Sequence, residues 1–82
     1  MGARVPRFFF DLHDDMTVID EEGLELSGPE EAHRRAFQNA AEMACTEVLE
    51  GHLKLKHRIE VRDESGATIA TVRFADVVKV EQ

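Results

Sequence analysis

The chain has 82 residues, of which 43% are hydrophobic, with seventeen acidic against ten basic side chains and a net charge of -7. A chain of this length forms one small domain and buries only about 60% of the surface that it exposes when unfolded. Its longest stretch without Asp, Glu, Lys or Arg, residues 65–72, is far shorter than the roughly 20 apolar residues of a membrane span. We therefore expect a single domain over residues 1–82, with a core over about 6–80, soluble and cytoplasmic, with no membrane partner.

The negative charge is concentrated in one quarter of the chain. Residues 11–31 contain nine acids and neither Lys nor Arg, whereas acids and bases balance in the remainder after residue 31. The pI is about 5.0, whereas nucleic-acid binders usually have a high pI and a basic surface that contacts phosphates. Nucleic acid is therefore not expected as the main partner.

The N-terminal part predicts two extended segments. In residues 7–13, Phe8, Phe10 and Leu12 alternate with polar or aromatic neighbours, which is typical of a strand with two different faces. A turn at Asp14-Asp15 leads to a shorter segment over residues 17–19. We expect this segment to continue over 24–26 after a bend or bulge at the intervening glycine.

A long amphipathic helix follows. Ser27 is expected to cap it, with Glu30 reaching back to the cap and Pro29 in the first turn. Alanines and other apolar residues then recur at spacings of three and four, and Gly51 provides a left-handed stop. At about 1.5 Å per residue the helix would be about 35 Å long and would overhang a seven-residue strand of about 23 Å. Leu53 and Leu55 are expected to cover the overhang.

The C-terminal part predicts a β-hairpin. Apolar and charged residues alternate from Leu53 to Arg62, the sequence 63–66 forms a loop that ends in Gly, and residues 67–74 are the returning strand. A turn and a short edge segment are expected over residues 75–80. The fold class is therefore α+β, a small antiparallel sheet in the order β-β-α-β-β with one long helix across one face.

Several segments together resemble a known family of short bacterial proteins. They are residues 6–10 (PRFFF), 22–26 (EGLEL), the alanines at 32, 36 and 40, 59–61 (IEV), 63–66 (DESG) and 72–76 (VRFAD). In order and spacing these segments resemble the family catalogued as domain of unknown function 6894, from Pro6 to about Val80. The resemblance implies a compact bacterial cytoplasmic domain, and it supplies no catalytic or ligand residues.

Two groups of residues have types that bind metals. Asp11, His13, Asp15 and Glu22 fit positions one, three, five and twelve of a calcium loop, but position six is Met16 instead of the required Gly. The carboxylates of Asp14, Asp15, Asp20, Glu21 and Glu22 could still hold calcium or magnesium weakly, which is one alternative function. Cys45, His52 and His57 lie within a dozen residues, but their spacing matches no zinc motif, and Cys45 is expected to be a small buried hydrophobe. No metal or other cofactor is therefore expected.

Two further activities are disfavoured by the sequence. Ser27 and Ser65 have structural uses as a cap and a turn residue, and the helix dipole opposes a thiolate at Cys45, so no nucleophile is evident. The glycines never cluster into a phosphate-binding loop. The chain is therefore expected not to be an enzyme. Lys54, Lys56, Arg58 and Arg62 could form the basic face of an RNA-binding sheet beside Phe9. Pairing of these bases with the domain's own acids is the simpler expectation.

The leading hypothesis is a non-enzymatic interaction domain that self-associates as a homodimer. If Phe8 and Phe10 lie under the helix, Phe9 points to the open face of the sheet, where Ile69 and Thr71 would join it as a contact surface. The alternative is an acidic regulatory partner of a basic protein, such as an antitoxin-like mimic of a polyanion. Its acidic patch would consist of Asp14, Asp15, Asp20, Glu21 and Glu22.

Overall fold

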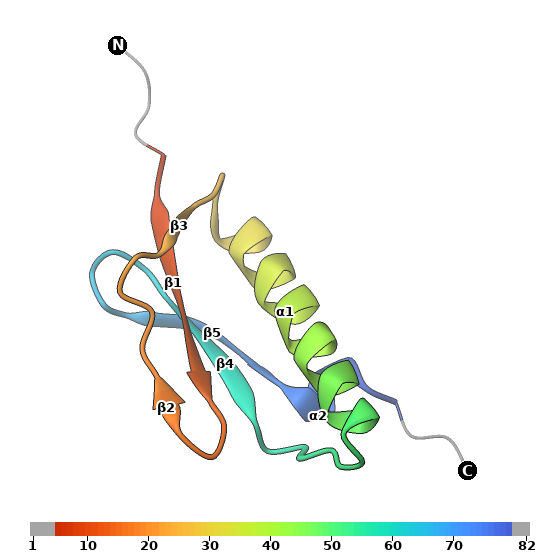
Figure 1. The fold of residues 1–82 in the computed structure, drawn as a ribbon. Coiled ribbons are helices and arrows are strands. Elements are labelled where there is room, and N and C mark those ends of the chain that lie inside the picture. The colour runs from red at the N-terminus through yellow and green to blue at the C-terminus, as the bar shows by residue number, and fades with distance from the viewer. Residues whose placement is uncertain (1–4, 80–82) are drawn as a thin grey trace.

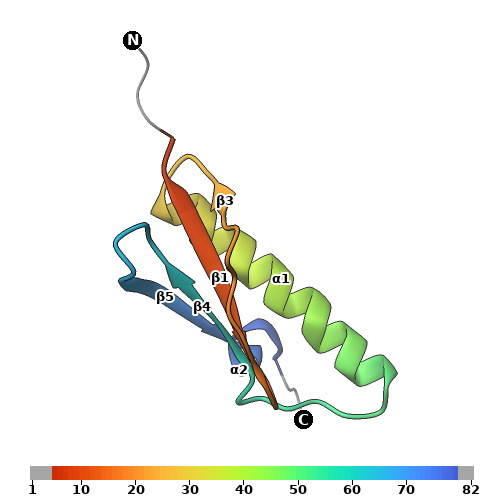
Figure 2. The ribbon, with the colours of Figure 1, turned by 60° about the vertical axis from the view of Figure 1, so that its left-hand side comes forward.

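The computed structural model describes residues 5–79, and Val80, at the end of the predicted tail segment, lies outside the described residues. Within 5–79 the elements are β1 (Arg7–His13), β2 (Thr17–Val18), β3 (Leu24–Glu25), α1 (Pro29–Leu49), β4 (Arg58–Arg62), β5 (Thr68–Arg73) and α2 (Phe74–Val77). The sheet is antiparallel in the order β2-β1-β4-β5, and β3 pairs with the first half of β1. The helix α1 lies across one face of the sheet (Figures 1 and 2). The predicted class, an antiparallel sheet with one long helix, is confirmed, although the order of elements includes an additional short strand and a short final helix.

The two short strands β2 and β3 share the outer edge of β1. Leu12 pairs with Val18 near the end of β1, and Phe8 pairs with Leu24 near its start. Gly23 makes the bend between them with a φ of 72°, a conformation that side chains with a Cβ disfavour. The bend predicted at this glycine is therefore confirmed, and it divides the second segment into two strands.

The helix α1 has the predicted bounds but a different cap. It begins at Pro29 and ends at Leu49, and Gly51 follows with a φ of 92°. The capping residue is Gly28, and the hydroxyl of Ser27 instead donates to Glu31 Oε2 at 2.6 Å. The predicted capping role of Ser27 is therefore wrong, because its hydroxyl is engaged by a carboxylate one turn further along the helix.

The strand predicted to begin at Leu53 begins only at Arg58. Residues 53–57 are an irregular connection with one turn at Leu55-Lys56, across which the His57 N–H donates to the Lys54 carbonyl at 3.2 Å. Of the two leucines expected to cover the end of the helix, Leu53 packs against the core, while Leu55 is 45% exposed. The hairpin loop at residues 63–66 is confirmed, with Asp63 accepting three hydrogen bonds from Ser65 and Ala67.

The core is formed where α1 faces β4 and β5. Four alanines at every fourth position of the helix are almost completely buried, at 0–2% exposure. Small side chains allow a helix to approach a sheet closely, and the larger core residues come from the opposite side. They include Ile59, Val61, Val72 and Phe74, each with 2% exposure or less.

The predicted C-terminal turn is a short helix that returns under α1. Phe74 begins α2, its N–H donates to the His57 carbonyl at 2.7 Å, and its ring is buried. Asp76 accepts the Arg73 N–H at 2.8 Å at the start of this helix. Neither α1 nor α2 combines the length and the apolar character that crossing a bilayer requires.

Candidate functional site

Burial on the helix-facing side of the sheet decreases from β4 toward β2. On β4, Ile59 and Val61 are 2% and 0% exposed, whereas Phe10 and Leu12 of β1 are only partly buried. Val18 pairs with Leu12 and therefore shares its face, and it is 55% exposed. Because α1 packs over β4 and β5, a strip of apolar surface remains open along β1 and β2.

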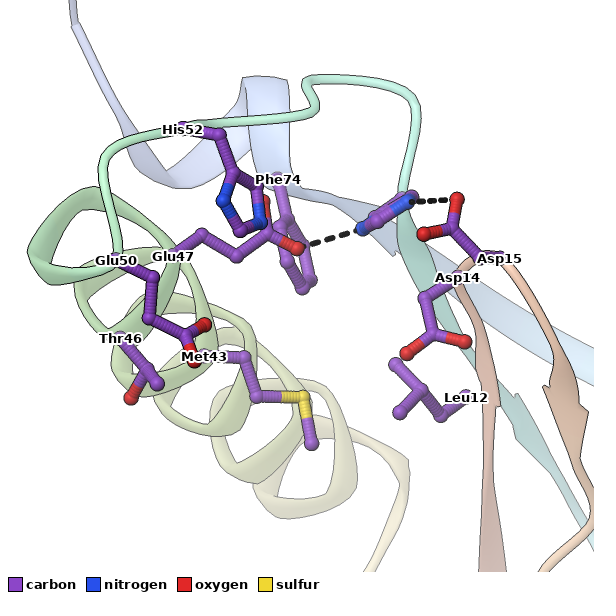
Figure 3. A pocket seen from close by; sticks show the side chains of 10 residues that line it. Leu12, Asp14, Asp15, Met43, Thr46, Glu47, Glu50, His52 and Phe74 are labelled. Atoms are coloured by element: carbon purple, nitrogen blue, oxygen red, sulfur yellow. Dashed lines mark hydrogen bonds and ion pairs between the residues drawn. The ribbon is translucent and has the colours of Figure 1, made fainter.

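This strip is the floor of a groove between α1 and the β1–β2 hairpin, which we call the α1–β2 groove. It consists of two adjoining cavities, of about 300 Å³ and about 480 Å³, and Leu12 and Met43 line both of them. Figure 3 shows these two side chains in the space between the helix and the hairpin. The second cavity is also lined by Phe10, Val18 and Ile19, so its floor is apolar.

Carboxylates line both walls of the groove. The hairpin and the loop after it provide Asp14, Asp15, Asp20, Glu21 and Glu22, and α1 provides Glu47 and Glu50. No Lys or Arg is among the residues that line these two cavities. The five residues of the predicted acidic patch are therefore brought together, and the helix adds two more acids.

Asp15 and Glu47 make specific contacts with the segment before β4. Lys54 Nζ lies 2.9 and 3.0 Å from the two carboxylate oxygens of Asp15, and its hydrogen bond lowers the pKa of that carboxyl. Glu47 accepts the Lys54 N–H at 2.8 Å through Oε1 and contacts His57 Nδ1 at 2.7 Å through Oε2. These contacts connect α1, the hairpin turn and the segment before β4.

Asp20 has a structural use. Its Oδ2 accepts the N–H of Phe10 at 3.1 Å, and its Oδ1 accepts those of Glu22 and Gly23 at 3.1 and 3.0 Å. Burial acts to raise the pKa of Asp20, but these N–H groups together outweigh it and the net shift is downward. The carboxylate thus gives a hydrogen-bond acceptor to the Phe10 N–H at the edge of β1, at a position where neither β2 nor β3 pairs with this strand.

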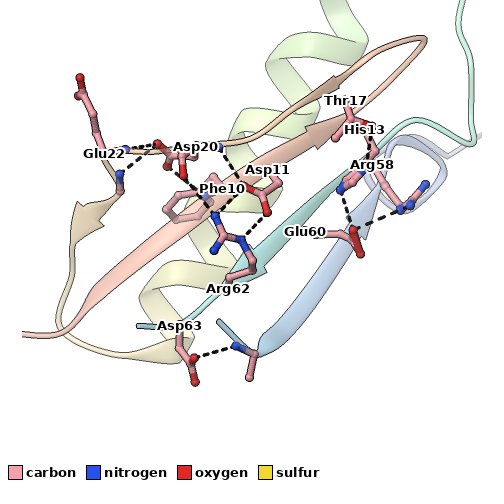
Figure 4. Close-up of polar contacts among 12 residues, drawn as sticks. Phe10, Asp11, His13, Thr17, Asp20, Glu22, Arg58, Glu60, Arg62 and Asp63 are labelled. Carbon is pink, nitrogen blue, oxygen red and sulfur yellow. Dashed lines mark hydrogen bonds and ion pairs between the residues drawn. The ribbon is translucent and has the colours of Figure 1, made fainter. Parts of the chain in front are cut away.

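The opposite face of the sheet carries a polar network around Asp11, which is 3% exposed (Figure 4). Arg62 donates to it through Nε at 2.5 Å and through a terminal nitrogen at 3.1 Å, and the Asp20 N–H donates at 2.9 Å. The Arg62 hydrogen bonds are the main cause of a lowered pKa at Asp11. Nearby, His13 Nε2 lies 2.7 Å from Glu60 Oε1.

The three residues of the predicted self-association surface lie on this open face, but not as one patch. Phe9 is partly buried, with the Arg62 guanidinium 5.1 Å from the centre of its ring. Gly23 packs so closely that a Cβ there would lie 2.8 Å from the same ring. Ile69 and Thr71 are exposed on β5, with β4 between them and Phe9. Residues of the domain itself therefore already contact the Phe9 ring.

The candidate metal ligands do not converge. Cys45 is exposed, which corrects the expectation of a buried hydrophobe, because it lies next to the buried ladder of alanines and not on it. In the calcium register, Asp11 contacts Arg62, His13 contacts Glu60 and Asp15 contacts Lys54. Among the residues that the structure describes, no three His, Cys, Asp or Glu side chains are arranged to hold a metal ion.

Three of the four bases considered for RNA binding pair with the domain's own acids, as expected. Lys54 contacts Asp15, Arg62 contacts Asp11, and Arg58 lies 3.9 Å from Glu60. The pattern of alternating charges does not by itself show which acid each base meets. On the sheet, the pairing of Arg62 with Asp11 depends on β1 lying beside β4, whereas Arg58 and Glu60 lie on the same strand.

The groove residues of the helix were not identified from sequence. Met43, Glu47 and Glu50 lie on the flank of α1 that faces the hairpin. Their spacing of three and four residues is the available signal, because it places them on one side of the helix next to the alanines. Only the tertiary structure shows that β1 and β2 lie opposite this side.

The fold and the site define a small α+β domain with an acid-lined apolar groove beside its one long helix. The comparison with family models matches residues 7–75 to the family described as Domain of unknown function (DUF6894). The chain therefore belongs to this family, as the resemblance indicated. Neither the comparison with curated proteins nor the comparison with solved structures found a match.

Proposed function

We propose that this domain is a non-enzymatic protein-binding module whose α1–β2 groove holds a basic amphipathic helix of another protein. The observation that carries the proposal is the combination of an open apolar floor with acidic walls. Val18 and Ile19 are 55% and 53% exposed, and Met43 across the groove is 37% exposed. A helix with apolar residues on one face and Lys or Arg on its flanks matches both features.

The free carboxylates of the groove determine the sign of the charge that a partner must carry. Glu21, Glu22 and Glu50 are exposed, and none of their carboxylates is engaged by a Lys or Arg in the described contacts. The groove therefore keeps uncompensated negative charge, which attracts cationic segments and repels acidic ones. This proposal develops the acidic-partner hypothesis by adding an apolar anchor to it.

The test uses a synthetic amphipathic peptide of Leu and Lys and a scrambled peptide of the same composition. The expected result is that the amphipathic peptide shifts the amide signals of Leu12, Val18, Ile19 and Met43, and that binding weakens as salt increases. The scrambled peptide should bind far more weakly, because its apolar residues do not form one face. Equal binding of both peptides, or shifts elsewhere on the domain, would contradict the proposal.

Matched variants on the two sides of α1 localise the binding. Met43→Glu places a charge in the groove, where Met43 is 37% exposed. Phe37→Glu is the control, because Phe37 is similarly exposed, at 43%, and lines neither cavity. We expect Met43→Glu to weaken binding about tenfold, as the loss of an apolar anchor does, and Phe37→Glu to leave it nearly unchanged. An equal loss in both variants would show that the groove is not the binding site.

Self-association remains a second candidate, favoured by the exposed edge strand β5. Ile69 is 38% exposed there, and Thr71 beside it is exposed as well. Unpaired strand edges are a common route to dimers. Light scattering over a range of concentrations should then detect a dimer, and Ile69→Lys should convert it to the 9.3 kDa monomer. A monomer at all concentrations would exclude this candidate.

A further inference from the structure

His57 occupies the junction of three parts of the fold. It is 4% exposed and precedes β4, and its ring makes an edge-on contact with Phe74 at 5.5 Å between ring centres. Its Nδ1 lies 2.7 Å from Glu47 Oε2 on α1, and its Nε2 lies 3.5 Å from Asp15 Oδ1 in the β1–β2 turn. Figure 3 shows the Glu47 carboxylate reaching from α1 and the Asp15 carboxylate reaching from the β1–β2 turn, on opposite sides of the space between these elements.

The two ring nitrogens of His57 have unequal partners. Because a carboxylate only accepts, the short contact with Glu47 requires a proton on Nδ1. In neutral imidazole Nε2 then carries a lone pair that faces the Asp15 carboxylate, buried and without a hydrogen-bond partner. A proton on Nε2 converts this unfavourable contact into an attraction between imidazolium and carboxylate.

We propose that His57 is a proton-controlled clamp, which in its doubly protonated form joins the β1–β2 turn to α1 and thereby holds the hairpin wall of the α1–β2 groove. When His57 loses a proton, the link to Asp15 is lost, while the link to Glu47 persists. The turn, which is exposed at Asp14, Asp15 and Met16, then loses its link to His57 and keeps the ion pair between Asp15 and Lys54.

The other groups around His57 favour this direction. Four carboxylates line the same cavity as His57, and they belong to Glu47 and Glu50 of α1 and to Asp14 and Asp15 of the turn. The basic groups near this cavity are Lys54, which contacts Asp15, and the imidazole of His52. The lowered pKa of Asp15, due mainly to Lys54, keeps this carboxylate charged over the range in which histidines titrate, about pH 5 to 8. Protonation of Nε2, which falling pH favours, therefore forms the clamp against a charged Asp15 carboxylate, and loss of that proton opens it.

The effect on partner binding rests on the proposed function, but the clamp itself can be tested on the free domain. The measurement follows the ring nitrogens of His57 by NMR, together with the amide signals of Asp15 and Met16, across about pH 5 to 8. The expected result is that the ring changes from doubly protonated to Nδ1-protonated, and that the turn amides shift with the same midpoint. A ring that keeps one proton throughout, or turn amides that do not follow it, would overturn the proposal.

Two variants separate the clamp from general effects of pH. In Asp15→Asn the turn amides should no longer follow His57, whereas in His52→Gln, which changes another histidine of the same cavity, they should follow it as before. Hydrogen exchange of the turn amides, corrected for intrinsic rates, measures how often the turn opens. We expect opening to increase about threefold when His57 loses its proton, and the factor is modest because Asp15 is solvent-exposed. An unchanged response in Asp15→Asn would also overturn the clamp, while failure of the peptide to bind would leave this result unaffected.

Discussion

The guanidinium of Arg62 contacts the carboxylate of Asp11 with two nitrogens, at 2.5 and 3.1 Å, and so joins the neighbouring strands β4 and β1 on the face opposite α1. Arg62 also donates to the Asp20 carbonyl at 3.2 Å and lies over the Phe9 ring. One side chain therefore connects the sheet to the loop between β2 and β3. The pair thereby holds the loop between β2 and β3, which lines part of the groove, against β1.

Replacing Arg62 with Met should destabilise the domain. The Asp11 carboxylate is 3% exposed, and the substitution leaves it without its principal donor. We expect a loss of about 2–3 kcal/mol in the free energy of unfolding, below the usual cost of breaking a fully buried pair because Arg62 is partly exposed. Urea denaturation measures this, with Arg58→Met as the control, since Arg58 is 41% exposed and its ion pair is 3.9 Å long. A loss in the control as large as that in Arg62→Met would contradict the special role of Arg62.

Acid should destabilise the domain through the same network. The pKa of Asp11, held down mainly by Arg62, is below its ordinary value, so the folded state binds fewer protons than the unfolded chain in mild acid. The stability from this carboxylate is thus fully present above about pH 4 and is lost as the pH falls through the folded-state pKa. Asp11→Asn should reduce this dependence in urea titrations at several pH values. Glu42→Gln, which removes an exposed carboxylate, should preserve it, and identical slopes in all three proteins would refute the assignment.

Gly23→Ala and Gly51→Ala should differ, although both glycines have positive φ. At Gly51 no atom lies within 4 Å of the added Cβ, so only the backbone conformation is strained, which costs about 1 kcal/mol. At Gly23 the Cβ would also lie 2.8 to 2.9 Å from atoms of Phe9, Arg7 and Phe8. We expect a total loss of about 2–4 kcal/mol there because steric overlap adds to the strain. Thermal or urea denaturation of the two variants provides the comparison, and equal losses would show that the overlap relaxes.

Enlarging an alanine under α1 should separate the helix from the sheet. Ala40 is 0% exposed at the centre of the buried ladder, so Ala40→Leu has no space and should cost about 1–3 kcal/mol in unfolding free energy. Gln38→Leu, on the exposed side of the same helix, should change stability by no more than about 0.5 kcal/mol. If Ala40→Leu were as stable as the wild type, the close approach of helix and sheet would be incorrect.

The elements with a clear period were predicted well. The alternation of residues 7–13 and the alanine spacing led to β1 and α1 with nearly correct bounds, because each pattern follows directly from strand or helix geometry. The segment from Leu53 to His57 was predicted as strand and is instead irregular, with one turn at Leu55-Lys56. Its leucines alternate with lysines, but the chain there connects the end of α1 to β4, and contacts with Glu47 determine its conformation.

The site was predicted only in part. The acidic residues from Asp14 to Glu22 are close in sequence, and the structure brings them together with Glu47 and Glu50, which are not. His57 was considered as a metal ligand, whereas it lies between two carboxylates from different elements. Distances of this kind depend on tertiary packing, which periodicity does not describe.

The residues alone were enough to predict the fold class, the long helix, its end just before Gly51 and the location of the acidic segment, since these depend on local geometry and on composition. Only packing in three dimensions settles which strands stay uncovered on the helix-facing side of the sheet. The alanine ladder seats α1 over β4 and β5 and leaves Phe10, Leu12 and Val18 partly uncovered beside the acids. A single helix is narrower than this five-stranded sheet, in which four strands lie side by side, so it covers only some of them.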